Sequence, residues 1–405
     1  MSPDLCIGFN SRPIVEALKR INRPVAAIDY FGDVDIRNSA DYLFSILDQR
    51  EDELIGRPMH RSAAEYLVSL AEVMSEEIEI EKVIVGSGLD DYPELWARLA
   101  TLGELCGNDP NRLSLLRDRE ILYKKAKEFN IQTPEMKVVT SPKEAGEYSQ
   151  QMSFPLVVKG STGGGGSNTI LCNTSIEVEK NVEETLEHCP SCYLLEFLRG
   201  FPASISLIGN GNECKTVAIN KQLIGCDFAA APSPFTYTGN ISPFNLPFKQ
   251  LKSIKEKFEL LGESLYLKGS NGFDFILDKD NEPYILELNP RIQGTLESIE
   301  LASEQSVIKM HLEAFEGELP EVSRFPHFCV KIVVFAPIHA KVPVITRKEA
   351  RDRPIPGSLI QPGMPYCSIL EVGSSEEKVL TEGKYKVSHI LELLGKQSCE
   401  LSQRG

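Results

Sequence analysis

Residues 272–291 constrain this chain most, because they predict a β-hairpin that carries three oxygen ligands on one face. Two apolar runs flank the polar stretch 278–283, whose Asp, Asn and Pro residues are typical of a turn. If this loop has an even number of residues, Asp274 lies opposite Glu287, with Cβ atoms about 5 Å apart. Asn289 follows Glu287 by two residues, so its side chain points to the same face.

Two facing carboxylates repel each other unless a cation lies between them. Mg²⁺ is commonly held by one or two carboxylates together with phosphate oxygens, and Mn²⁺ accepts similar ligands. The pattern therefore favours a metal site at Asp274, Glu287 and Asn289. The alternative is a solvated polar face on an edge hairpin.

A second segment predicts a loop that covers phosphate groups. A buried strand over residues 154–159 ends in Lys159 and leads to Gly163, Gly164, Gly165, Gly166 and Ser167. Ordering four successive glycines is costly in conformational entropy, but their N–H groups can approach phosphate oxygens and form an anion nest. The Gly-Lys-Ser/Thr of a P-loop and the spaced glycines of a dinucleotide fold are both missing. The alternative is a flexible surface linker.

Together these motifs resemble the ATP-grasp superfamily, and most closely its biotin-carboxylase-like branch, which includes predicted ATP-dependent carboxylate–amine ligases. The resemblance covers about residues 112–303 and implies an ATP-grasp fold with ATP and Mg²⁺ as cofactors, Mn²⁺ being a possible substitute. It implies that the lysine contacts phosphate and adenine and that a Glu-led hinge binds the adenine edge. The ATP-binding residues implied are Arg119, Lys159, Gly163, Gly164, Gly165, Gly166, Ser167, Glu196, Phe197 and Leu198; the metal ligands implied are Asp274, Glu287 and Asn289.

Two positions depart from the family pattern. Arg119 stands where the family usually has a lysine; it keeps the charge but offers a planar fork in place of a point charge. Thr295 stands where biotin carboxylases have the glutamate proposed as the base for bicarbonate. This threonine argues against bicarbonate chemistry of that type.

The resemblance implies a ligase that activates a small-molecule carboxylate as an acyl phosphate and couples it to an amine, releasing ADP and phosphate. Arg291 is expected to hold the substrate carboxylate or the acyl phosphate, unless it only braces the hairpin through Glu287 or Glu297. Lys221 is a weaker catalytic candidate, its alternative being an exposed lysine at a strand end. Two other functions stay open: an ATP-dependent carboxylase that uses bicarbonate, and a non-catalytic nucleotide-binding protein.

Composition favours a cytoplasmic protein. No apolar run approaches the roughly 18 residues that a membrane span needs, and the N-terminus lacks the basic start of a signal peptide. The net charge of −15 opposes nucleic acid or an anionic membrane as the main partner, while a homodimer is possible. Ten irregularly spaced cysteines are typical of reduced packing residues. Cys189 and Cys192 have C-x-x-C spacing, but no second pair completes a zinc site, so we expect a structural role.

Alternating strand and helix patterns predict an α/β fold in three parts. We expect an open parallel α/β domain over residues 1–111, an ATP-grasp domain over 112–325 with a lid subdomain at about 134–195, a small β-rich domain over 326–395 and a frayed tail over 396–405. A single helix is expected over 112–129. Loops 9–12 and 29–35 follow strands, where open α/β sheets bind ligands. The uncharged segment 228–244 is expected to be a long loop, either a cover for the site or a packed connector.

Overall fold

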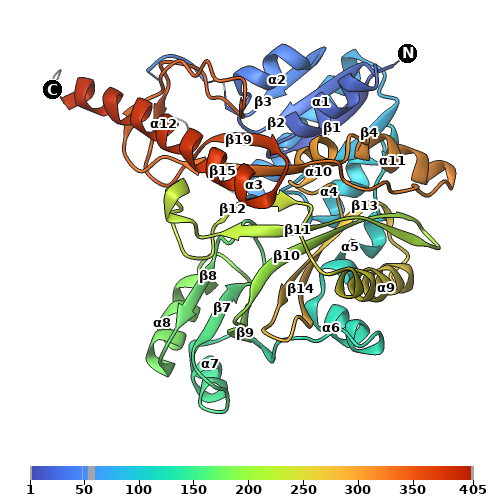
Figure 1. The fold of residues 1–405 in the computed structure, drawn as a ribbon, viewed down its shortest axis with the longest axis vertical. Coiled ribbons are helices and arrows are strands. Elements are labelled where there is room, and N and C mark those ends of the chain that lie inside the picture. Colours follow the sequence, from blue (N-terminus) through green and yellow to red (C-terminus); the bar gives the residue numbers. More distant parts are fainter. Residues whose placement is uncertain (1, 48, 53–59, 403–405) are drawn as a thin grey trace.

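The computed structural model describes residues 2–47, 49–52 and 60–402, which form four sheets flanked by helices (Figure 1). The N-terminal sheet lies at one end of the molecule and the lid subdomain at the other. A large antiparallel sheet lies between them. The fold is therefore of the mixed α/β class that the sequence predicts. Within these residues, no helix combines the length and apolar character required to cross a membrane.

The N-terminal sheet has five parallel strands in the order β3-β2-β1-β4-β5. The strands are β1 (Asp4–Gly8), β2 (Val25–Asp29), β3 (Tyr42–Ser45), β4 (Lys82–Val85) and β5 (Glu104–Cys106), and the helices are α1 (Arg12–Arg20), α2 (Val34–Ser39), α3 (His60–Glu77) and α4 (Pro93–Leu99). Strands β1 and β2 are buried throughout, as expected of apolar strands covered on both faces. Because the strands are parallel, the loops at their carboxyl ends gather at one edge.

The central sheet has eight strands in the order β14-β13-β10-β11-β12-β15-β19-β17. They are β10 (Phe201–Asn210), β11 (Cys214–Ile224), β12 (Tyr237–Ser242), β13 (Lys268–Leu277), β14 (Pro283–Asn289), β15 (Phe328–Phe335), β17 (Ala350–Arg351) and β19 (Pro365–Gly373). Strand β12 corrects the prediction of one long loop over 228–244, because it pairs with both β11 and β15. Its Gly239 has a φ of +129°, and a Cβ there would lie 1.9 Å from the carbonyl oxygen of Lys331. This close approach explains a glycine inside a strand.

Residues 326–395 continue the central sheet, since β15 pairs with β12 and with β19. Helix α12 (Glu376–Ser402) packs on these strands through Val379, Val387, Ile390 and Leu394. The tail expected to fray beyond residue 396 continues this helix as far as Ser402, and residues 403–405 lie outside the described part. The short strands β16 (Ala340–Lys341) and β18 (Leu359–Ile360) form a separate pair.

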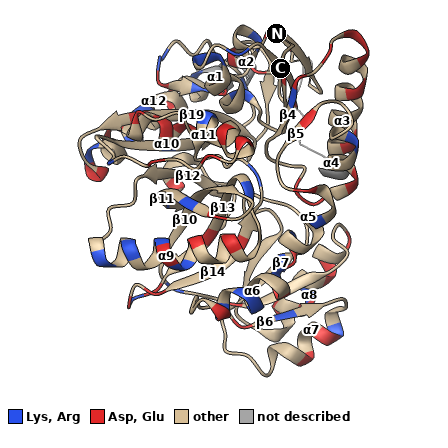
Figure 2. Cartoon of the chain, turned by 90° about the vertical axis from the view of Figure 1, so that its right-hand side faces the viewer, with Lys and Arg blue, Asp and Glu red and all other residues tan. Residues whose placement is uncertain are grey.

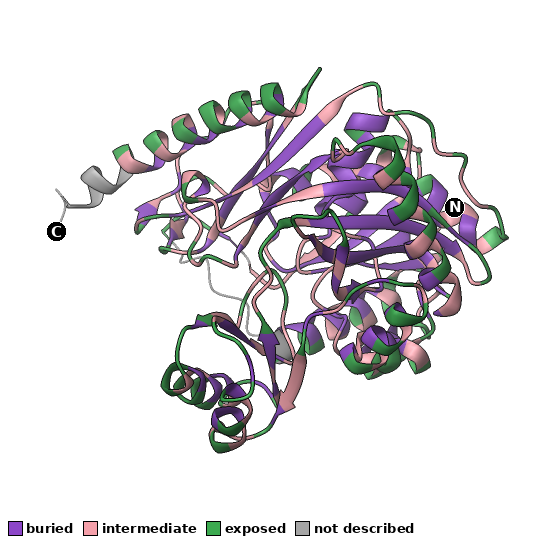
Figure 3. Cartoon of the chain, turned by 60° about the horizontal axis from the view of Figure 1, so that its bottom comes forward, coloured by how far each residue is buried: buried purple, intermediate pink, exposed green. Residues whose placement is uncertain are grey.

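The lid subdomain is a four-stranded sheet in the order β6-β9-β7-β8, with two helices on it. Its elements are β6 (Met136–Val139), α7 (Pro142–Ser149), β7 (Leu156–Gly160), β8 (Thr169–Cys172), α8 (Ser175–Leu186) and β9 (Cys192–Glu196). The lid has a small core of its own, and the outer faces of α7 and α8 are exposed (Figure 3). Cys189 and Cys192 are both free and buried, in keeping with a packing role.

The helix expected over residues 112–129 is two helices, α5 (Pro110–Arg117) and α6 (Arg119–Glu128). Asp118 separates them in an extended conformation, and its carboxylate caps α6 by accepting a hydrogen bond from the N–H of Ile121 (3.0 Å). The break places Arg119 in the first turn of α6, beside β14. Three further helices, α9 (Phe248–Ser264), α10 (Leu296–Ser303) and α11 (Val307–Glu313), pack near the central sheet. The Lys residues of α9 lie toward its N-terminal end and the Glu residues toward its C-terminal end (Figure 2).

A buried ionic cluster joins the N-terminal sheet to the central sheet. The guanidinium of Arg12 donates to both oxygens of Glu297 (2.6 and 2.7 Å) and through Nε to Asp352 (2.6 Å). Lys331 Nζ on β15 donates to the same Glu297 (2.9 Å). Burial raises the pKa of Glu297, but the charges of Arg12 and Lys331 outweigh it and hold that pKa well below its usual value. The cluster is thus ionised and links four segments of the chain, which are α1, α10, β15 and the residue after β17.

We expect Arg12→Leu to lower the free energy of unfolding by about 3 kcal/mol, because it leaves buried carboxylates without their main partner. Urea unfolding would measure the change. The matched control is Lys19→Leu on the same helix, whose pair with Asp41 (2.8 Å) is half exposed and is expected to contribute less than about 1 kcal/mol. Equal effects of the two substitutions would contradict the structural role given to the cluster.

Candidate ATP and metal site

A cavity of about 1050 Å³ opens between the N-terminal sheet, the lid and the central sheet. Its walls include the hairpin of β13 and β14, the glycine loop of the lid and the loops at the carboxyl ends of β1, β2 and β4. Residues of β15 and β19 complete it. This volume is at the upper end of the range for small-molecule sites, so it has room for more than one ligand.

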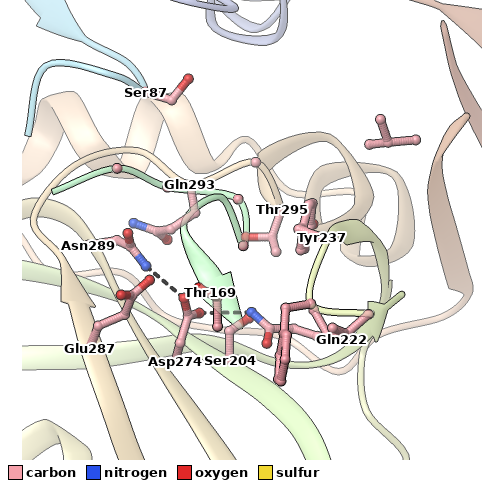
Figure 4. A pocket seen from close by; sticks show the side chains of 18 of the residues that line it. Ser87, Thr169, Ser204, Gln222, Tyr237, Asp274, Glu287, Asn289, Gln293 and Thr295 are labelled. Atoms are coloured by element: carbon pink, nitrogen blue, oxygen red, sulfur yellow. Dashed lines mark hydrogen bonds between the residues drawn. The ribbon is translucent and has the colours of Figure 1, made fainter. Parts of the chain in front are cut away.

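The predicted hairpin is present, with Asp274 on β13 directly opposite Glu287 on β14. The register shifts after Asp274, where a bulge separates this pair from Phe275. Asn289 donates to one oxygen of Asp274 (3.0 Å), and Gln222 on β11 donates to the other (2.8 Å). Figure 4 shows these side chains together on the cavity wall. The structure therefore brings together the three residues predicted as metal ligands.

The two carboxylates have opposite electrostatic surroundings. Burial raises the pKa of Asp274, and the charge of Glu287 raises it further. Burial also raises the pKa of Glu287, but Lys159, Arg119 and Arg117 outweigh this effect and hold it well below its usual value. Glu287 is thus the ionised member of the pair in the ligand-free protein.

Basic side chains from the lid and from helix α6 converge on Glu287. Lys159 at the end of β7 donates to its Oε2 (2.7 Å), and Arg119 donates to the same oxygen (2.5 Å). Arg119 also lies over the ring of Tyr193, with 4.5 Å between its Cζ and the ring centroid. Both cations line the cavity. Lys159 and Arg119 share one carboxylate oxygen, and both side chains could exchange this hydrogen bond for one to a phosphate oxygen of a nucleotide.

The glycine loop lies over the cavity and is held from two sides. Gly163 N–H donates to Asp91 of the N-terminal domain (3.1 Å), and Gly165 accepts from the N–H of Tyr237 (3.0 Å). A Cβ on Gly166, whose φ is +84°, would lie 1.9 Å from the carbonyl oxygen of Phe235. The loop therefore needs glycine for both its backbone conformation and its close packing.

Most residues predicted to bind nucleotide lie on the cavity wall, and two expected site residues do not. Glycines 163–166 and the hinge residues Glu196, Phe197 and Leu198 line the cavity. Ser167 lies outside the lining and donates to the carbonyl oxygen of Gly164 (2.8 Å). Lys221 is also outside the lining, because its Nζ is paired with Glu376 at the start of α12 (2.5 Å). Adjacent residues of a strand face opposite sides, so Gln222, and not the weaker candidate Lys221, lies on the cavity wall.

Arg291 lies on the cavity wall, but its partner differs from those considered in the sequence analysis. Its Nε is 3.0 Å from the carboxylate of Asp90, in the loop after β4, and one of its terminal nitrogens donates to the carbonyl oxygen of Ile292 (3.0 Å). The partner is thus neither Glu287 nor Glu297. Arg291 is thus paired with a carboxylate of the N-terminal domain at the cavity wall.

Sequence reasoning missed several residues of the site. Arg117 binds Asp91 (2.8 Å) and the carbonyl oxygen of Leu288 (3.1 Å), and it lines the cavity. Asp90 and Asp91 follow β4, so the rule that loops after parallel strands bind ligands could have found them. The sequence around Gln222 and Lys331 does not indicate that their side chains face the cavity, because that direction depends on the register of the central sheet.

The hairpin suits a divalent cation that is also bound by phosphate. Two carboxylates and an amide oxygen are hard donors, and Mg²⁺ usually takes few protein ligands and completes its shell with water and phosphate oxygens. Among the described residues, no group of three or more His, Cys, Asp or Glu side chains is placed to hold a metal ion. Asp274, Glu287 and Asn289 therefore fit a metal that enters with a nucleotide better than a permanently caged one.

Comparison with known proteins agrees with this geometry. An uncharacterized protein of Methanocaldococcus jannaschii is 26% identical over 369 residues, which cover 90% of this chain and 87% of the relative. The carbamoyl phosphate synthase large chain of Thermoanaerobacter sp. is 25% identical over 244 residues, or 58% of this chain. The match covers only 22% of that large chain.

Two solved structures have the same fold at low identity. The biotin carboxylase domain dimer of Hydrogenobacter thermophilus 2-oxoglutarate carboxylase, in complex with MgADP, ADP and bicarbonate, has a TM-score of 0.72 at 15% identity, over 94% of this chain and 88% of that one. The L-amino acid ligase of Bacillus licheniformis has a TM-score of 0.69 at 16% identity, over 96% and 97% of the two chains. Residues 117–295 match the ATP-grasp domain family. The family match thus identifies residues 117–295 as an ATP-grasp domain, and the fold of the whole chain is that of the two solved structures.

Proposed function

We propose that this protein is an ATP- and Mg²⁺-dependent ligase that activates a carboxylate as an acyl phosphate and couples it to an amine. The observation that carries the proposal is the hairpin pair of Asp274 and Glu287, which faces Lys159 and Arg119 beneath a glycine loop. Two carboxylates that can bind Mg²⁺, facing two basic side chains that can bind phosphate oxygens, suit the metal-bound triphosphate of ATP. The reaction releases ADP and phosphate.

ATP lies with its phosphates under the glycine loop and its adenine at the hinge. Lys159 and Arg119 leave Glu287 for phosphate oxygens, which replaces one charge-assisted hydrogen bond by another. Glu196, Phe197 and Leu198 lie at the end of β9 and form the edge for adenine. The N–H groups of the glycine loop cover the phosphates and exclude water from the reacting group.

Asp274, Glu287 and Asn289 would hold Mg²⁺, which would supply positive charge to offset the negative charge of the phosphates. The carboxylate substrate attacks the γ-phosphorus, and the bond to the leaving ADP oxygen breaks. Arg291 turns from Asp90 to the substrate carboxylate and then to the acyl phosphate. The neutral amine attacks the acyl carbon, phosphate leaves and the amine proton passes to solvent.

Two observations weigh against a carboxylase that uses bicarbonate. Thr295, at the place of the biotin-carboxylase glutamate, has its hydroxyl 3.2 Å from that of Ser206, and a threonine is a poor base. The nearby Glu297 is bonded to Arg12 and Lys331, which hold its pKa well below the usual value. An acid so firmly ionised and paired cannot accept a proton near neutral pH.

One of the similar structures, an L-amino acid ligase, supports the proposed ligase function. Another, a biotin carboxylase domain with MgADP and bicarbonate, supports the use of a Mg-bound adenine nucleotide and fits the alternative function. The biotin carboxylase domain is described as a dimer, which is the support for a homodimer here; light scattering at several concentrations would test it.

The test is a screen of carboxylates and amines for ADP release from Mg-ATP. A ligase releases ADP only when an acid and an amine are both present. Release that depends on bicarbonate would favour the carboxylase. Tight binding of ATP without turnover by any pair would favour a non-catalytic nucleotide-binding protein.

We expect the glycine loop to gain protection when nucleotide binds. Hydrogen exchange across residues 160–167 is expected to slow on adding Mg-ATP, because phosphate oxygens engage N–H groups that now face the cavity. Some protection should exist beforehand at Gly163, which is bonded to Asp91. Exposed peptides of helix α8 serve as the internal reference. Unchanged exchange at saturating nucleotide would refute the role of the loop.

Either Asp274→Ala or Glu287→Ala is expected to lower kcat by about a hundredfold or more, since charge neutralisation of the phosphates is lost. Asp274→Ala should leave the melting temperature near that of the unaltered protein, because it removes a buried acid whose charge is unfavourable. Glu287→Ala should lower it, since Lys159 and Arg119 lose their partner. Near-normal turnover in either variant would rule out the magnesium assignment.

Arg291→Lys is expected to bind ATP nearly normally but to turn over at least about tenfold more slowly. Lysine keeps the charge but loses the bidentate fork that fits a carboxylate or an acyl phosphate. ATP affinity, melting temperature and kcat are measured on one preparation. Together they distinguish a role of Arg291 in catalysis from a structural role in the ion pair with Asp90. A variant that loses stability yet keeps its kcat would show that Arg291 serves only the pair with Asp90.

A further inference from the structure

Asp33 is a buried acid on the cavity wall that the proposed chemistry does not use. It precedes helix α2 in the loop after β2 and is only 9% exposed. Aspartate at this position normally caps its helix, but the Asp33 side chain makes no capping hydrogen bond. The Asp33 carboxylate therefore does not stabilise the N-terminus of α2.

One oxygen of Asp33 is held in place by Gln49. The Gln49 amide nitrogen donates to Asp33 Oδ1 (2.9 Å) and to the carbonyl oxygen of Phe31 (2.8 Å). Its amide oxygen accepts from the N–H of Ile355 (2.8 Å), which fixes the orientation of the amide. The second oxygen, Oδ2, has no hydrogen-bond partner among the described residues. A positioned carboxylate with one free oxygen thus lies on the cavity wall.

The acids around Asp33 are all engaged elsewhere. Asp29 accepts from Ser11 and from the N–H groups of Phe31 and Gly32, and Asp35 is paired with Arg353 (2.6 Å). Asp352 is held by Arg12 and by Asn10 (2.6 and 2.9 Å). Burial raises the pKa of Asp33 well above its usual value, and the charges of Asp352 and Asp29 raise it further. The described surroundings of Asp33 are therefore acidic, and they supply no ion-pair partner for it.

A cation bound here is organic rather than metallic. The described residues offer no cluster of three or more metal-binding side chains, and both oxygens of Asp29 and of Asp35 are already engaged. Phe31 and Tyr366 also line the cavity and provide apolar surface for a carbon chain. A single carboxylate beside aromatic rings suits an alkylammonium group, which needs one strong acceptor and apolar contact for its methylenes.

We propose that Asp33 binds the ammonium group of a substrate, so that one of the two coupled molecules is an amino acid or a diamine. This inference rests on the proposed ligase function and names its substrate class. A protonated amine cannot attack an acyl phosphate. The ammonium held at Asp33 is therefore the α-ammonium of an amino-acid donor or the second amine of a diamine acceptor, and Asp33 is a specificity-determining residue.

The experiment measures ADP release from Mg-ATP with L-amino acids and short diamines, each compared with its mono-N-acetylated form. In the unaltered enzyme, acetylation is expected to raise KM by at least about tenfold, the effect of losing a charge-assisted hydrogen bond. In Asp33→Asn, KM for the free compound is expected to rise similarly, while KM for ATP stays within about twofold. The compound that responds, amino acid or diamine, shows which substrate carries the ammonium.

The control is Asp227→Asn, an exposed acid outside the cavity lining, for which no change is expected. Asp33→Asn should fold, because it replaces a buried acid without a cationic partner. Equal KM values for free and acetylated compounds, or an unchanged KM in Asp33→Asn, would overturn the inference while leaving the ligase intact. If no pair releases ADP, a melting temperature raised by ammonium compounds in the unaltered protein but not in Asp33→Asn would support the ammonium site and reject the ligase. No shift in either protein would overturn the inference.

Discussion

The site depends on the cross-strand register that places Asp274 opposite Glu287. Two buried carboxylates at that separation raise each other's proton affinity, so the fold must supply positive charge to keep one of them ionised. It does so with Lys159 from the lid and Arg119 from α6, which share one oxygen of Glu287. Glu287 therefore connects the lid and α6 to the hairpin. Nucleotide binding is then an exchange of ion pairs, and its net free energy is smaller than the new phosphate contacts alone would indicate.

The hairpin and the position of the glycine loop could be predicted from the sequence because their signals are local. Turn residues between two apolar runs define the hairpin, and the period of two along a strand puts Glu287 and Asn289 on one face. The glycine run and the lysine before it are likewise contiguous. Asp118 showed the limit of such reasoning, since its choice between continuing one helix and capping a second depends on packing against β14.

The residues that escaped prediction take their direction from distant partners. Lys221 and Gln222 are neighbours on β11, and only the pairing of β11 with β10 and β12 decides which of them faces the cavity. Strand β12 contains Gly239 and Asn240, residue types that are depleted in strands, and it forms because two strands flank it. Asp33 and Asp90 lie in loops whose ligand-binding position follows from the parallel sheet, but their free or paired state depends on the C-terminal segment and on Arg291.

The hydrogen bond between Asp91 and the glycine loop connects the N-terminal domain to the lid. Asp91 binds both Arg117 and the N–H of Gly163, so the connection between β4 and α4 sets the height of the cavity ceiling. One residue added to that connection lengthens it by about 3.5 Å, roughly the width of a methylene group. A change in the length of this loop would therefore alter the height of the cavity without replacing any residue of the hairpin or of the glycine loop.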